Sequence, residues 1–190
     1  MQLLLGSNSP RRNELLAQMG YEFTKVVINC DESIDEGLKP EDVAEYLAIK
    51  KSSEYSGLTK TQVLLTADTV VICDSKILNK PRNYNEAFEM LNLLSNKDHK
   101  VITGVCLKSN NKTISFSEVT EIAVDALTKK EIEYYLKNYK PFDKAGSYGI
   151  QEWFGICKIS SIKGDYYNAV GLPCNALFKR LNKDFKVNVS

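Results

Sequence analysis

The sequence contains a single histidine, His99, among its 190 residues. One imidazole excludes a metal site built from several histidines and leaves little scope for a nucleophile activated by a histidine-based triad. We therefore interpret His99 as a structural residue. The five cysteines are odd in number, scattered, and form no C-x-x-C pair, which argues against a disulfide framework and against a thiolate zinc site. A reducing cytoplasm is the expected compartment.

Long hydrophobic runs and an excess of one charge are also missing. No apolar run reaches the ~18 residues of a membrane helix, and the best candidate, 63–73, is interrupted by Asp68. The apolar stretch 3–5 is too short for a signal peptide, so we expect a buried strand there. Lys and Arg number 25 and Asp and Glu 24, a formal net charge of +1. Because no basic block is present, we expect the protein to bind neither a membrane nor the phosphate backbone of nucleic acid.

The remaining composition predicts one globular domain that covers residues 1–190. Hydrophobic residues make up 43% of the chain and charged residues 26%, values typical of a folded domain. Segments with helical spacing of apolar residues alternate with β-branched runs, so we expect an α/β fold with a mixed sheet flanked by helices. The expected strands are 2–5, 23–28, 63–66, 70–73, 77–78, 101–107 and 113–124. The expected helices are 10–19, one capped by Asn83 or Asn85 that ends at Leu94, and three that begin near Pro40, Thr128 and Pro173.

Polar residues follow the first expected strand at a place suited to an anion. Ser7 and Ser9 precede a helix that opens with Pro10, and Arg11 and Arg12 lie in its first turn. Serine hydroxyls, the unpaired N–H groups of a first helical turn and two guanidiniums suit a phosphate group. An ordinary capped helix with solvated arginines explains the same spacing about equally well, and the doubled arginine favours the phosphate site.

Asp68 is the polar residue that stands out in the apolar run. A carboxylate is costly to bury unless a metal ion or a lysine meets it, and ligands bind at strand ends in α/β sheets. The alternative is that Asp68 lies just past a strand end and caps a turn with Thr69. More carboxylates lie in the polar segment 29–39, where they could hold a magnesium ion or simply be solvated. They are Asp31, Glu32, Asp35 and Glu36.

Lysine and glutamine side chains are further candidates for nucleotide binding. Lys50, Lys51 and Lys80 could neutralise a polyphosphate, although most lysines only keep a surface soluble. Gln151 ends the segment 143–151, in which two glycines permit tight turns. Its amide carries donors and an acceptor that can read the edge of a nucleobase. A glycine-containing hairpin is the alternative explanation of this segment.

Several of these residues stand in motifs that recur together in one family. The motifs are 7–12, 31–32, 67–71, 80–82, 94–95 with His99, 103–105, 143–151, 164–166 and 170–173. In this order they resemble the Maf family of nucleoside triphosphate pyrophosphatases, over residues 4–177. The Asp-Lys-Ala-Gly-Ser-Tyr-Gly-Ile-Gln version of 143–151 is similar to the subgroup that acts on dTTP and UTP, and differs from the subgroup that acts on 7-methyl-GTP.

The resemblance implies an activity, a fold and a role for each candidate residue. The activity would be hydrolysis of dTTP, UTP and related nucleotides to the monophosphate and pyrophosphate, as housekeeping of the nucleotide pool. The fold would be an elongated α/β domain with a twisted mixed sheet and a central cleft, often dimeric. Asp68 would accept a proton or bind a divalent cation with Glu32, and the sequence does not separate these roles. The cation would be Mg²⁺, with Mn²⁺ or Co²⁺ as substitutes. Base specificity would depend on Arg11, Thr69 and Gln151, and phosphate binding on Ser7, Ser9, Arg12, Lys51 and Lys80.

Three positions depart from the usual pattern of the family. Tyr46 stands where an arginine is common, Thr66 where a glycine is common, and Glu152 where a glycine follows the glutamine. We expect a carboxylate beside the base site to alter nucleotide preference, for instance toward the 4-amino group of cytosine. Two other functions stay open: a nucleotide-binding regulator of cell division without turnover, and a pyrophosphatase that prefers 7-methyl-GTP. Asp68 argues against the first, and segment 149–151 argues against the second.

Overall fold

The computed structural model describes residues 1–35 and 37–189. The predicted acidic residue Glu36 therefore lies outside the described residues. The chain divides into two compact units. The first unit consists of Met1–Asp68, Thr103–Glu118 and Gly171–Ser190, and the second of Thr69–Ile102 and Val119–Val170.

The described residues form a seven-stranded sheet in the order β2-β1-β3-β5-β6-β7, with β4 beside β3. β1 pairs in parallel with β2 and β3, whereas β4 and β7 pair antiparallel with β3 and β6. The predicted mixed α/β fold is therefore confirmed. The strands are β1 (Gln2–Leu5), β2 (Phe23–Lys25), β3 (Gln62–Cys73), β4 (Lys76–Leu78), β5 (Asp98–Lys108), β6 (Thr113–Val124) and β7 (Ile159–Lys163).

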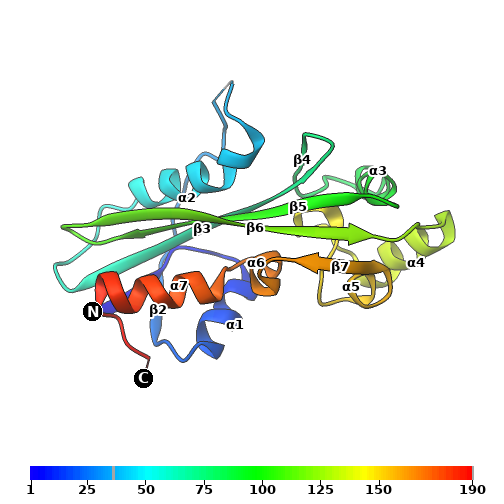
Figure 1. The fold of residues 1–190 in the computed structure, drawn as a ribbon. Coiled ribbons are helices and arrows are strands. Elements are labelled where there is room, and N and C mark those ends of the chain that lie inside the picture. Colours follow the sequence, from blue (N-terminus) through cyan, green and yellow to red (C-terminus); the bar gives the residue numbers. More distant parts are fainter. Residues whose placement is uncertain (36, 190) are drawn as a thin grey trace. The chain divides into compact units, whose positions relative to one another are not determined.

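Helices and short helical turns connect these strands (Figure 1). The α-helices are α1 (Pro10–Gln18), α2 (Val43–Ser53), α3 (Tyr84–Leu94), α4 (Lys129–Tyr139), α5 (Trp153–Lys158), α6 (Tyr166–Val170) and α7 (Cys174–Arg180). The turns are the 3₁₀ turns η1 (Pro40–Asp42) and η2 (Ala145–Ser147) and the π-helical turn η3 (Leu181–Phe185). None of the helices in the described ranges is both long and apolar enough to cross a membrane.

In the first unit, helices cover both faces of the strands. Figure 1 shows α2 on one side and α1 and α7 on the other. The inward side chains of β1 and β3, among them Leu3, Leu5 and Leu64, are fully buried. α2 packs directly on β5 at Gly104, where a Cβ atom would overlap the backbone of Ala44. This glycine therefore lets the helix approach the sheet closely and fixes where α2 lies.

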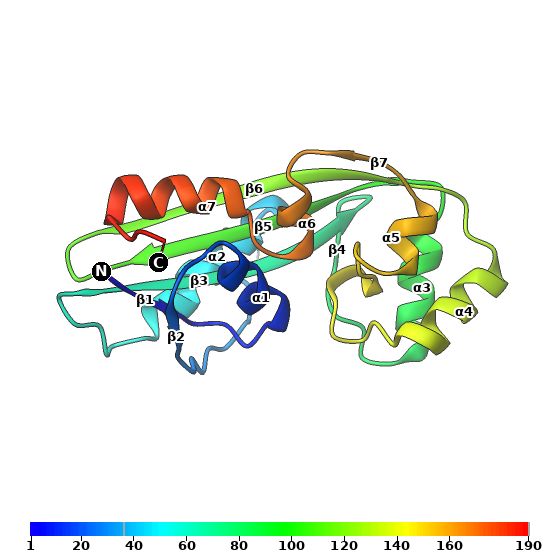
Figure 2. The same cartoon turned by 90° about the horizontal axis from the view of Figure 1, so that it is seen from below.

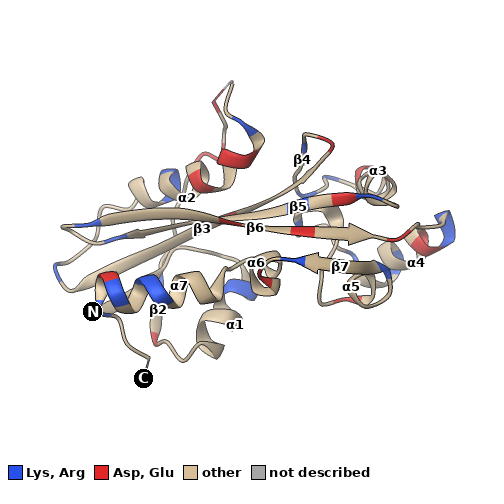
Figure 3. Ribbon diagram, in the orientation of Figure 1, with Lys and Arg blue, Asp and Glu red and all other residues tan. Residues whose placement is uncertain are grey.

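In the second unit, α3, α4 and α5 lie close together (Figure 2), and aromatic side chains of α4 and α5 form a buried group. Its centre is Tyr135, which is fully buried and packs against Phe154 with ring centroids 5.6 Å apart. The predicted cap at Thr128 is present as a capping box with Glu131, and Asn83, rather than Asn85, caps α3. Acidic and basic positions are mixed along α4, as Figure 3 shows.

Three local predictions are wrong. The expected strands 63–66 and 70–73 are one continuous strand, β3, because the apolar residues on both sides of Asp68 are buried without interruption. The strand expected over 23–28 ends at Lys25, where its pairing with β1 ends. The hairpin that was the alternative explanation of segment 143–151 does not form; the segment contains a short turn in which Gly146 and Ser147 adopt positive φ values of 68° and 61°.

Candidate active site

The turn between β1 and α1 is lined by serine hydroxyls. Ser9 caps α1, and its Oγ accepts a hydrogen bond from the backbone N–H of Arg12 at 3.5 Å. Ser7 Oγ accepts from the N–H of Ser9 at 3.3 Å and from Nη1 of Arg12 at 3.2 Å. Both predicted serines therefore lie together at the positive end of a helix, a place that favours an anion.

Arg12 joins this turn to β3. Its side chain is buried, its Nη1 donates to the carbonyl of Ala67 at 2.8 Å, and its Nε donates to the carbonyl of Gly171 at 2.8 Å. Burial lowers the pKa of the Arg12 guanidinium, and the nearby charge of Asp68 acts in the opposite direction. An arginine stays protonated at any physiological pH, so Arg12 brings a fixed positive charge next to Asp68.

Asp68 lies in the middle of β3. The alternative interpretation, in which Asp68 lies just past a strand end, is therefore wrong. The burial argument called for a metal ion or a lysine, and a lysine contacts the carboxylate: Lys51 Nζ donates to Oδ1 of Asp68 at 2.5 Å. The same ammonium lies 2.9 Å from Oε1 of Glu32. The side chains of Lys51 and Asp68 are only 14% and 16% exposed, whereas Glu32 is 58% exposed. We call Glu32, Lys51 and Asp68 the carboxylate–lysine cluster.

The packing of α2 places Lys51 over Asp68. Thr66, two residues before Asp68 on β3, is fully buried, and its Oγ1 donates to the carbonyl of Ala48 at 2.7 Å. This bond fixes the middle of α2 against the strand, and the close approach at Gly104 fixes its first turn. Thr66 therefore has a structural role.

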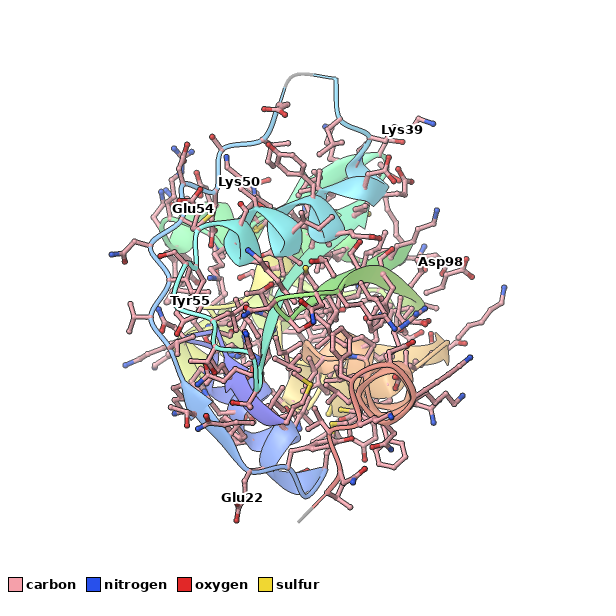
Figure 4. The ribbon with its side chains drawn as sticks, turned by 90° about the vertical axis from the view of Figure 1, so that its left-hand side faces the viewer. Glu22, Lys39, Lys50, Glu54, Tyr55 and Asp98 are labelled. Carbon is pink, nitrogen blue, oxygen red and sulfur yellow. The ribbon has the colours of Figure 1, made fainter. Side chains whose placement is uncertain are left out.

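Lys50 points to a different partner from Lys51. Its Nζ donates to the carbonyl of Ser33 at 2.9 Å, and it lies 4.0 Å from Asp31. Figure 4 labels Lys50 on α2, the helix that also carries Lys51, and Glu54 directly after the end of this helix. Asp31 itself accepts from the Ser33 hydroxyl and N–H, and these bonds lower its pKa. The structure thus separates the two lysines, and only Lys51 reaches Asp68.

The carboxylate–lysine cluster has the chemistry of a site for a divalent cation that also binds substrate oxygens. Oε1 of Glu32 and Oδ1 of Asp68 converge on a single point, which the Lys51 ammonium holds. In the described part of the chain no group of three or more histidine, cysteine or acidic side chains could hold a metal ion. Mg²⁺ needs only one or two carboxylates when phosphates and waters complete its shell, so two converging carboxylates fit it.

Three of the remaining predicted residues belong to the second unit, whereas Arg11 is half-buried in α1 of the first unit. Thr69 is the next residue of β3 and is half-buried, whereas Lys80 and Gln151 are exposed. Gln151 follows the buried Ile150 and lies in a turn closed by a hydrogen bond of 3.1 Å from the N–H of Glu152 to the carbonyl of Gly149.

Glu152 does not present a free carboxylate. Its Oε2 accepts from the hydroxyl of Tyr135, and its Oε1 lies 3.1 Å from Nζ of Lys144. The reason is local geometry: α4 presents Tyr135 to the buried side of segment 143–152.

Comparison with known proteins decides the family. The family described as Maf-like protein matches residues 2–184 of this chain, which is nearly its whole length. The chain belongs to the Maf family.

Named relatives of this Maf-family protein agree with the resemblance. It is 43% identical to a dTTP/UTP pyrophosphatase of Phocaeicola vulgatus over 96% of this chain and 95% of the relative. It is 42% identical to a dTTP/UTP pyrophosphatase of Flavobacterium psychrophilum, over 93% and 91% of the two chains. A dTTP/UTP pyrophosphatase of Porphyromonas gingivalis is 44% identical, over 97% and 94%. The predicted family is confirmed, and these proteins bear the name of the predicted subgroup.

Sequence reasoning missed Tyr135 and Lys144 as partners of the base-site segment. Tyr135 has one signal in the sequence, because it places a hydroxyl on the apolar face of the amphipathic helix 129–139. A buried tyrosine hydroxyl usually finds a hydrogen-bond partner, but the sequence does not say which one. Lys144 lies in the motif 143–151, but nothing in the sequence around it indicates that it contacts Glu152.

Proposed function

We propose that this Maf-family protein hydrolyses dTTP, UTP and related nucleoside triphosphates to the monophosphate and pyrophosphate. The observation that carries the proposal is the contact of Lys51 with both Glu32 and Asp68. It brings a carboxylate that can accept a proton together with a cation that can bind a polyphosphate. The names of the relatives support the same activity.

Asp68 accepts the proton of the attacking water in this proposal. Burial in the middle of β3 and the bond from Lys51 to Oδ1 hold its carboxylate in one orientation. A positioned carboxylate contributes ~10²–10⁴-fold as a general base. Orienting the carboxylate requires no free energy during the reaction, because the strand and α2 already hold it in place.

Cationic groups offset the charge that develops on the departing pyrophosphate. Arg12 is held by two backbone carbonyls and brings its charge beside Asp68. The Lys51 ammonium has three donors and contacts two carboxylates, so it can donate to a phosphate oxygen while it keeps its bond to Asp68. A divalent cation held by Glu32 and Asp68 would supply Lewis-acid stabilisation of the phosphate oxygens when bound. The other groups assigned to the phosphates are Ser7, Ser9 and Lys80.

Base recognition is assigned to Gln151, with Arg11 and Thr69. The amide of Gln151 has an acceptor and two donors, and the 4-keto, 3-imino edge of uracil and thymine offers the complementary pair. Because both bases share this edge, both triphosphates are accepted. Mg²⁺ as the cation, a homodimer as the assembly and the cytoplasm as the compartment are part of the same proposal.

The experiment is an assay of the common nucleoside triphosphates and 7-methyl-GTP with Mg²⁺, in which both products are identified. We expect dTTP and UTP to give the monophosphate and pyrophosphate, and Asp68→Asn to lower kcat by at least ~10²-fold while the circular dichroism spectrum is unchanged. Asp74→Asn is the matched control, because Asp74 pairs with Lys97 on the surface of the second unit. Orthophosphate as the product, a preference for 7-methyl-GTP, or full activity of a folded Asp68→Asn protein would refute the proposal.

A further inference from the structure

A chain of polar contacts links the two ends of segment 143–152 to each other and, through Gly149 and Glu152, to α4. The backbone N–H of Gly149 donates to the hydroxyl of Tyr135 at 2.9 Å, and this hydroxyl donates to Oε2 of Glu152. Oε1 of Glu152 lies 3.1 Å from Nζ of Lys144, which also contacts Oδ1 of Asp143 at 2.7 Å. The contacts run without a gap from the first residue of the segment to the last.

The anchor of this chain is rigid. Tyr135 is 0% exposed, and its ring stacks on Tyr139 and Trp153 with centroids 5.1 Å and 6.2 Å apart. Burial, and then the bond to Glu152, raise the pKa of the Tyr135 hydroxyl far above its ordinary value. The hydroxyl therefore stays protonated at physiological pH and can donate to Glu152.

Gln151 lies inside the part of the segment that these contacts hold. The N–H of Glu152 donates to the carbonyl of Gly149, so Gly149 and Glu152 are bonded to each other and both to Tyr135. A Cβ atom at Gly149 would come within 2.7 Å of the carboxyl carbon of Glu152, so a larger residue there would require the Glu152 side chain to shift. The backbone of Gln151 is thereby fixed while its side chain is exposed.

We propose that Tyr135, Glu152 and Lys144 form a clamp that positions Gln151 for base recognition, and that Glu152 does not contact the base. Both oxygens of Glu152 already have partners, and these contacts hold the carboxylate toward Tyr135 and Lys144 instead of leaving it free to turn to the 4-amino group of cytosine. A fixed backbone lowers the ordering cost of each hydrogen bond that Gln151 makes to a nucleotide. The inference rests on the proposed function, because it takes Gln151 as the residue that reads the base.

Nucleotide binding by variants of the clamp residues tests this proposal. Dissociation constants are measured by calorimetry for the non-hydrolysable α,β-imido analogues of dUTP and dCTP, with kcat for dTTP measured separately. We expect Tyr135→Phe and Glu152→Gln to weaken binding of the dUTP analogue by ~5–10-fold, to leave the weak binding of the dCTP analogue unchanged, and to change kcat by less than ~2-fold. The matched controls Tyr134→Phe and Glu133→Gln lie on the exposed side of α4 and should bind like the natural protein.

A second background separates positioning from a general loss of structure. In Gln151→Ala, the clamp variants should weaken binding of the dUTP analogue no further, because the residue through which they act is gone. A further loss in that background, or unchanged binding of the dUTP analogue by Tyr135→Phe, would overturn the proposal. If Glu152→Gln binds the dUTP analogue more strongly, relative to the dCTP analogue, than the natural protein does, Glu152 contacts the base and the proposal is wrong. If the natural protein binds dUTP through Gln151 but does not hydrolyse dTTP, the proposed function fails and the clamp stands.

Discussion

Folding stability at mildly acidic pH should depend on His99. This side chain is 3% exposed, its Nε2 lies 2.6 Å from the hydroxyl of Tyr148, and its Nδ1 has no hydrogen-bond partner among the described residues. Burial lowers the pKa of His99 to about 4 from an ordinary value of 6.5. Between pH 6.5 and 4, His99 therefore binds a proton in the unfolded chain but not in the folded protein. Stability from this group is complete above pH 6.5 and falls as the pH falls toward 4.

The two pKa values set the size of the effect. At pH 5 the linkage relation gives a loss of about 2 kcal/mol relative to pH 8, a large part of the ~5–15 kcal/mol that stabilises a typical domain. Glu131 does not disturb the comparison. Its hydrogen bonds with Lys158 and Thr128 lower its pKa to about 2, so its contribution is lost only below its ordinary value of 4.5.

Urea unfolding of the natural protein and of His99→Gln at pH 5 and pH 8 measures this contribution. Glutamine keeps a polar partner for Tyr148 but does not titrate, so the loss between the two pH values should be about 2 kcal/mol smaller in the variant. The absolute stability of His99→Gln is not the test, because the substitution also changes packing. An equal pH dependence of the two proteins would refute the reasoning.

Three other predictions concern the first unit. Gly104→Ala should lower the free energy of unfolding by ~1–3 kcal/mol in urea titration, because its Cβ would meet the backbone of α2. In the control Gly57→Ala the added Cβ meets only a tyrosine side chain, so the free energy of unfolding should change by less than ~0.5 kcal/mol. Equal effects of the two substitutions would contradict the packing argument. Lys51→Met should lower kcat/KM for dTTP by ~10²-fold or more, whereas Lys50→Met should keep near-natural activity; equal losses would remove the special role of Lys51. Glu32→Gln should raise the Mg²⁺ concentration for half-maximal activity by ~10-fold, and an unchanged requirement would remove Glu32 from the cation site.

Local signals in the sequence predicted the helix starts well. Ser9, Asn83 and Thr128 each satisfy N–H groups of the helix that follows within three residues, so the information is contained in the segment itself. The mixed sheet followed from the same kind of evidence, because alternating helices and β-branched runs have few other ways to pack.

Partners distant in sequence could not be read in the same way. Asp68 looked like the end of a strand because a carboxylate interrupts an apolar run, but Lys51 meets it from α2, and the strand continues. The sequence suggested that Glu152 is a free acceptor beside Gln151. In the structure, Tyr135, which lies 17 positions earlier on α4, donates a hydrogen bond from its hydroxyl to one of the Glu152 oxygens. In both cases the partner is set by how helices pack, which residue spacing does not encode.

The position of nucleophilic attack tests the central claim most directly. dTTP is hydrolysed by the natural protein in water enriched in oxygen-18, and both products are analysed by mass spectrometry. If the carboxylate–lysine cluster directs water to the α-phosphorus, one labelled oxygen appears in the thymidine monophosphate and none in the pyrophosphate. Label in pyrophosphate or in orthophosphate, with an unlabelled nucleotide product, would contradict the account.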